Sequence, residues 1–84
     1  MSNKALVEIS VPAATEKYDV YIPLESKMGE VVKMVASVLS DLSDGKYKAT
    51  DDAILCDAET GTIFNINMEV AELGIKTGSR LMLI

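Results

Sequence analysis

The stretch SKMGEVVKMVASVLSDLSDG, residues 26–45, decides the fold because it is the one long run of the 84-residue chain with helical periodicity. Its apolar residues recur at spacings of three and four and form one stripe: Met28, Val31, Val35, Val38, Leu39 and Leu42. Ser26 is the expected N-cap, Glu30 suits the helix dipole in the first turn, and Gly45 is the expected C′ stop. Valine is a mediocre helix former, so this helix depends on packing against a tertiary partner.

The residues before the helix alternate with a period of two, which predicts a β-hairpin. In the first strand, over 5–11, four apolar residues share one face: Ala5, Val7, Ile9 and Val11. In the second strand, over 17–22, Tyr18, Val20 and Ile22 oppose Lys17, Asp19 and Tyr21. Each strand therefore has one face toward a core and one toward water.

Shorter elements follow the helix. They are a strand over 53–56, its partner over 63–64, a single helical turn over 70–75 and a last strand over 80–84. The polar, turn-rich residues 43–52 are expected to form a surface loop, with Tyr47 as its only large apolar group. Gly61 and Gly78 lie in turns that precede strands, where we expect positive φ.

This order predicts an α+β fold of the β-grasp, or ubiquitin-like, type. One amphipathic helix covers a mixed four- to five-stranded sheet, and the two terminal strands lie parallel in its centre. The alternative is a ferredoxin-like sandwich, which needs a second full helix that residues 66–76 are too short and too polar to supply. Residues 1–84 are expected to form a single domain.

Two segments carry a resemblance to known families. The tail VAELGIKTGSRLMLI, residues 70–84, resembles the end of ubiquitin-like domains, of the form V-x-x-L-G-I-x-x-G-x-x-L-x-L. The segment YDVYIP, residues 18–23, with an apolar helix about five residues later, resembles the YukD/EsaB family. These are small bacterial ubiquitin-like proteins encoded with type VII secretion systems. The resemblance, which runs from about residue 5 to residue 84, implies an accessory or regulatory protein that docks on another component of that secretion machine.

The composition argues against enzymes and cofactor proteins. The chain has no histidine and one cysteine, Cys56, so the commonest general base, the commonest metal ligand and a cysteine zinc site are all missing. Without a histidine to activate it, Cys56 is expected to pack in or near the core beside Ile54 and Leu55. The acidic residues at 51–52 and 57–59 lack the spacing of a calcium loop. We expect no enzyme activity, no cofactor and no metal.

Charge and hydropathy bear on partners and location. A formal net charge of −5 repels phosphate backbones, so no nucleic-acid partner is expected. No apolar run is long enough to enter a membrane, and the residues leading into Glu8 lack the apolar core of a signal peptide, which predicts a cytoplasmic protein. The sequence stops at Ile84 without Gly-Gly, so we expect no conjugation. The alternatives are a modifier or sulfur carrier, and an adaptor domain in an unrelated assembly.

The candidate protein-binding site is the outer face of the sheet. Strand alternation places Leu6, Tyr21, Met82 and Ile84 on this face, and adjacent terminal strands would bring Leu6, Met82 and Ile84 into one apolar patch. The alternative is that these are scattered surface apolar residues, which are normal on any protein. The sequence names neither the partner nor the oligomeric state.

Overall fold

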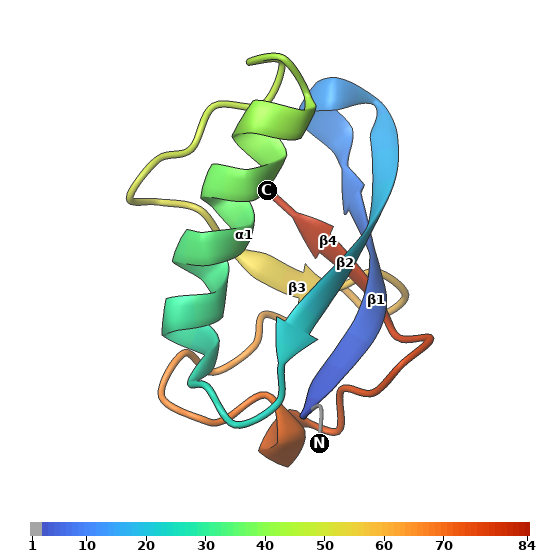
Figure 1. Cartoon of the computed structure of the whole chain (residues 1–84), viewed down its shortest axis with the longest axis vertical. Coiled ribbons are helices and arrows are strands. Elements are labelled where there is room, and N and C mark those ends of the chain that lie inside the picture. Colours follow the sequence, from blue (N-terminus) through green and yellow to red (C-terminus); the bar gives the residue numbers. More distant parts are fainter. Residues whose placement is uncertain (1–2) are drawn as a thin grey trace.

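One helix packs across a four-stranded sheet in the computed structural model, which describes residues 3–84 (Figure 1). Met1 and Ser2 lie outside these residues. They belong to the predicted domain of residues 1–84 and to the amino end that was expected to lack a signal peptide. The strands are β1 (Lys4–Val11), β2 (Glu16–Pro23), β3 (Leu55–Asp57) and β4 (Arg80–Leu83), and the helix is α1 (Met28–Leu42). Two short 3₁₀ turns, η1 (Pro12–Ala14) and η2 (Ala71–Leu73), complete the described elements.

The strand order β2-β1-β4-β3 confirms the β-grasp prediction. β1 pairs antiparallel with β2 and parallel with β4, so the two terminal strands are central neighbours. The predicted apolar face of β1 is buried throughout, as are Leu81 and Leu83 of β4. These side chains and the inner face of α1 form one core, which supplies the burial that a small domain needs.

The predicted apolar stripe of α1 is partly wrong. The buried residues of the helix are Met28, Val31, Val32, Val35, Ala36 and Leu39. Val38 and Leu42 remain 38% and 56% exposed, whereas Val32 and Ala36 face the sheet. Residue spacing shows which side chains share a face, but the angle at which the helix lies on the sheet selects the buried ones.

Both ends of α1 also differ from the predictions. The N-cap is Lys27 rather than Ser26, with no side-chain cap. The N–H groups of Met28 and Gly29 instead donate to the carbonyl oxygens of Met68 and Ile66, at 2.8 and 3.0 Å. A loop distant in the sequence thus satisfies donors that a local side chain was expected to satisfy.

At the C-terminal end of α1, the C′ position belongs to Asp44, with φ of 54°, and Gly45 follows it. The Gly45 N–H donates to the Ser40 carbonyl at 3.0 Å and the Asp44 N–H to that of Asp41 at 3.2 Å, the pattern of a Schellman motif. Gly45 therefore helps to end the helix, but from the C″ position rather than the predicted C′ position.

Two loop predictions are corrected. Tyr47 is buried, not exposed on a surface loop, because it packs into the hydrophobic core. Its N–H also donates to Ser43 Oγ at 3.0 Å. Residues 63–64 form no strand; Ile63 makes a single bridge to Cys56. The positive φ angles expected at Gly61 and Gly78 are confirmed, at 76° and 96°.

Candidate functional site

The outer face of the sheet is the face turned away from α1. The buried residues of β1 alternate with Leu6, Glu8 and Ser10, which are only partly covered. The same alternation puts Lys17, Asp19 and Tyr21 of β2 and Met82 of β4 on this face. Strand alternation therefore places the predicted binding residues of the strands on one side of the sheet.

Leu6 and Tyr21 form one apolar unit of this face, which we term the Leu6–Tyr21 pair. They are direct cross-strand partners in the β1–β2 register, and Tyr21 is 62% exposed. On the other side of Leu6 lies the loop before β4: the Leu6 N–H donates to Thr77 Oγ1 at 3.1 Å, and the Gly78 N–H donates to the Leu6 carbonyl at 3.0 Å. The Tyr21 phenol is therefore exposed to solvent, next to a strand that hydrogen bonds hold to the loop before β4.

Met82 and Ile84 form a second apolar unit, the Met82–Ile84 pair. Met82 lies opposite Ser10 on β1 and Cys56 on β3, and Ile84 is 52% exposed. The main chain of Ile84 is held by two hydrogen bonds of 2.9 Å with Ile54. The residue that follows β4 is therefore held against the residue that precedes β3.

The strand register separates these two units. Because Met82 pairs with Ser10, it lies four residues along β1 from Leu6, about 13 Å at the usual rise per residue. Glu8 lies between them, with an exposed ion pair to Lys17 at 3.9 Å. The expectation of one continuous patch of Leu6, Met82 and Ile84 is therefore replaced by two apolar units with charged residues between them.

Cys56 has the buried environment that the sequence predicted. Its side chain is 2% exposed beside Met82, and its thiol donates to the Met82 carbonyl at 3.7 Å. Burial, with a smaller contribution from Asp57, raises the pKa of the Cys56 thiol. A raised pKa lowers the thiolate fraction, so this is the environment of a packing residue rather than of a nucleophile.

Asp57 explains part of the acidic cluster that follows β3. Asp57 Oδ1 accepts the N–H groups of Glu59 at 2.8 Å and Thr60 at 3.0 Å. The hydrogen bonds from Thr60 and then Glu59 lower the pKa of the Asp57 carboxyl. This carboxylate shapes the turn. Among residues 3–84, no group of three or more metal-ligating acidic or cysteine side chains comes together.

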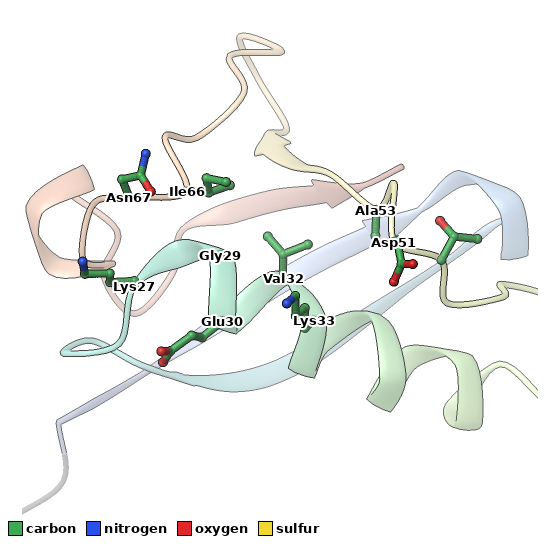
Figure 2. A pocket seen from close by; sticks show the side chains of 10 residues that line it. Lys27, Gly29, Glu30, Val32, Lys33, Asp51, Ala53, Ile66 and Asn67 are labelled. Atoms are coloured by element: carbon green, nitrogen blue, oxygen red, sulfur yellow. The ribbon is translucent and has the colours of Figure 1, made fainter.

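A cavity of about 470 Å³ lies beside the amino-terminal half of α1 (Figure 2). Its walls come from α1, from the loop over 50–53 and from Ile66 and Asn67. Gly29 permits the close approach of this loop, because a Cβ there would lie 3.2 Å from the Ile66 carbonyl oxygen. The sequence alone did not predict this cavity, because its lining comes from three separated segments without a shared motif.

The hairpin, the single covering helix and the central parallel pair of terminal strands define the class of the protein as a ubiquitin-like β-grasp domain. The profile described as "WXG100 protein secretion system (Wss), protein YukD" matches residues 6–83. The chain therefore belongs to the YukD family, as the sequence resemblance indicated.

Solved structures share the fold at low sequence identity. The EccD5 ubiquitin-like domain from Mycobacterium xenopi has a TM-score of 0.80 at 20% identity, over 96% of this chain and 92% of that one. The ubiquitin-like domain of the Mycobacterium tuberculosis type VII secretion protein EccD1 has a TM-score of 0.76 at 16% identity, over 96% and 97%. A chain of the MycP5-free ESX-5 inner membrane complex has a TM-score of 0.72 at 18% identity, over 98% of this chain and 21% of that one. Comparison with curated proteins finds no match.

Within residues 3–84, no helix is both long and apolar enough to cross a membrane.

Proposed function

We propose that the protein is a ubiquitin-like interaction module that acts as an accessory or regulatory component of a type VII secretion system, by binding rather than by catalysis. The observation that carries the proposal is the YukD family match over residues 6–83. A binding role is favoured because the lone thiol is buried with a raised pKa and the chain has no histidine.

The proposed partner is a protein component of the secretion machine at the inner membrane. A ubiquitin-like fold of the same kind is part of a chain in the ESX-5 inner membrane complex, which supports this choice. The proposed contact surface is the outer face of the sheet, with the Leu6–Tyr21 pair and the Met82–Ile84 pair as its apolar anchors. Exposed tyrosine and methionine are enriched at protein interfaces, where they contribute contact area.

A capture experiment tests both parts of the proposal. Tagged wild type, Ile84→Glu and Met82→Glu are incubated with detergent-solubilised membranes from the bacterium that carries the gene, and bound proteins are identified by mass spectrometry. The matched control is Ile66→Glu, because Ile66 is 57% exposed but lines the cavity beside α1. Circular-dichroism melts establish that each variant is folded.

We expect the wild type and the control to recover an inner-membrane secretion component, and the two outer-face variants to lose about tenfold or more of it, because a charge would be desolvated without a partner. Equal recovery by all four proteins would refute the outer face as the contact surface. Recovery of no secretion component by the wild type would refute the secretion role.

A further inference from the structure

β2 is an edge strand that is paired on one side only. The strand order places it at the end of the sheet, with β1 as its neighbour (Figure 1). It runs for eight residues, from Glu16 to Pro23, and pairs with β1 along its whole length. An edge of this length presents a row of backbone groups on which another chain can add a strand.

The hydrogen bonds of β1 show which groups of β2 face outward. The Leu24 N–H donates to the Asn3 carbonyl at 2.7 Å, so the odd-numbered residues of this part of the chain bond toward β2. The Glu8 N–H donates to the Ser79 carbonyl at 3.0 Å, so the even-numbered residues of β1 bond toward β4. In an antiparallel pair, residues whose backbone groups bond to the partner strand alternate with residues whose backbone groups point away from it.

The partners of the even-numbered β1 residues are Lys17, Asp19 and Tyr21, and their N–H and C=O groups point away from β1. No hydrogen bond within residues 3–84 pairs these backbone groups. Pro23 is the next outward position and has no N–H, so the open segment ends at Tyr21.

The opposite edge of the sheet is covered. The Asp57 N–H donates to the Thr62 carbonyl at 2.9 Å, and the Phe64 N–H donates to the Leu55 carbonyl at 3.3 Å. Residues 62–64 thus cover the edge of β3 that does not pair with β4. Within the described part of the chain, the β2 edge is the one that remains open over several residues.

The flank of α1 beside this edge is apolar. Gly29 and Lys33 lie on the flank that faces the loop over 50–53, and the helical repeat places Met34, Val38 and Leu42 on the opposite flank, toward β2. These three side chains are 37%, 38% and 56% exposed. Tyr18 and Val20 of β2 pack partly against the core on the same side. A strand added at the edge would therefore place every second side chain on apolar surface.

We propose that the β2 edge binds an extended segment of a partner protein, with aliphatic residues at alternate positions and basic residues beside them. The segment would pair with the backbone of Lys17, Asp19 and Tyr21 and lay its aliphatic side chains against Val20 and Val38. This site shares Tyr21 with the Leu6–Tyr21 pair, through its backbone rather than its side chain. It does not involve the Met82–Ile84 pair, and it does not depend on the secretion role.

The charges around the edge favour a basic occupant. Glu16 and Asp19 lie on the strand, and Lys17 is already near Glu8, with 3.9 Å between Nζ and Oε1. The hydrogen bond from Tyr18 Oη to Glu16 (2.6 Å) raises the pKa of the Tyr18 phenol, with smaller contributions from burial and from the negative charges of Glu16 and Asp44.

The same charges disfavour a second copy as the occupant. The antiparallel register that pairs all three outward positions of two copies sets Asp19 opposite Asp19, and like charges directly opposite are destabilising.

The test uses a fluorescein-labelled peptide of about ten residues, with valine and threonine alternating and two lysines at its amino end. Its affinity is measured by fluorescence anisotropy for the wild type, Asp19→Pro and Asp19→Ala. Proline removes the outward N–H without touching a bond to β1, whereas alanine keeps the N–H and removes only the charge. A second matched set places the same charge on the apolar flank of α1, with Val38→Glu, and on an exposed position beside it, with Ser37→Glu. Amide hydrogen exchange of the wild type is recorded with and without the peptide.

We expect Asp19→Pro and Val38→Glu to weaken binding about tenfold or more, and Asp19→Ala and Ser37→Glu to change it by less than about threefold. The peptide should also slow exchange at the amides of Lys17, Asp19 and Tyr21. Four results would each overturn the proposal. They are no binding of the peptide, equal affinity for the wild type and Asp19→Pro, slowed exchange on the outer face and not at the β2 edge, and self-association that Asp19→Pro abolishes. If Asp19→Pro loses the peptide but still captures the secretion component, the proposed secretion role does not need the β2 edge. The two proposals can therefore fail independently.

Discussion

Leu39 and Leu42 allow the orientation of α1 to be tested with a single kind of substitution. Both are leucines in the last turns of the same helix and belong to the stripe that the sequence predicts. In the structure Leu39 is 0% exposed and Leu42 is 56% exposed. Replacement of each by alanine should therefore have very different effects on the free energy of unfolding, although the change in helix propensity is the same.

The magnitude follows from burial. Leucine to alanine removes about three methylene-sized groups, worth about 0.8 kcal/mol each when buried, or about 2.4 kcal/mol. At Leu39 an unfilled cavity adds to this loss, so Leu39→Ala should cost about 3–4 kcal/mol. At Leu42 less than half of the side chain is buried and solvent replaces it, so Leu42→Ala should cost less than about 1 kcal/mol.

The assay is urea unfolding followed by far-UV circular dichroism, with thermal melts beside it. For a domain of this size, about 4–8 °C of melting temperature corresponds to 1 kcal/mol, so Leu39→Ala should lower the midpoint by more than about 12 °C and Leu42→Ala by less than about 8 °C. Losses within about 0.5 kcal/mol of each other would refute the orientation of α1 described above.

Three further predictions concern the loops and the thiol. Hydrogen bonds lower the pKa of Asp57 on folding, so its stabilising contribution should be present above the unfolded pKa of about 4 and be lost as pH falls through the folded pKa; Asp57→Asn should flatten the dependence of urea midpoints on pH, and an unchanged dependence would contradict this. Cys56 should react with a disulfide reagent at least about tenfold more slowly in the native protein than in denaturant, because it is buried with a raised pKa; equal rates would show that the thiol is accessible. Gly78→Ala should cost about 1–2 kcal/mol in urea unfolding, since φ is 96° and no atom lies within 4 Å of the added Cβ, and a stabilising effect would rule out this backbone strain.

Sequence periodicity was sufficient for the class of fold. The alternation in 5–11 and 17–22, the helical repeat in 26–45 and the absence of a second helix predicted a β-grasp domain, and the paired terminal strands confirm it. The glycines of the turns were predictable for the same reason: the need for positive φ is set by a few adjacent residues.

Long-range contacts decided the features that the sequence analysis missed or placed wrongly. Tyr47 is buried because it packs into the core that the sheet and α1 form, and the first N–H groups of α1 bind carbonyls of the loop at 66–68. Neither partner is adjacent in the sequence, so no local pattern marks them. Ile63 likewise pairs with β3 through a single bridge. One bridge does not make the fifth strand that the apolar residues 63–64 predicted.

The sequence by itself determined which residues of each strand and of the helix share a face, because side-chain direction repeats every 2 residues in a strand and every 3.6 in a helix. Only the tertiary structure decided how those faces meet. The parallel register of β1 and β4 sets Met82 beside Ser10 and away from Leu6, which divides the expected patch. The angle of α1 on the sheet buries Ala36 and leaves Leu42 in water. Register and packing angle are set by how the side chains of separate elements fit together, and that fit is absent from any one segment.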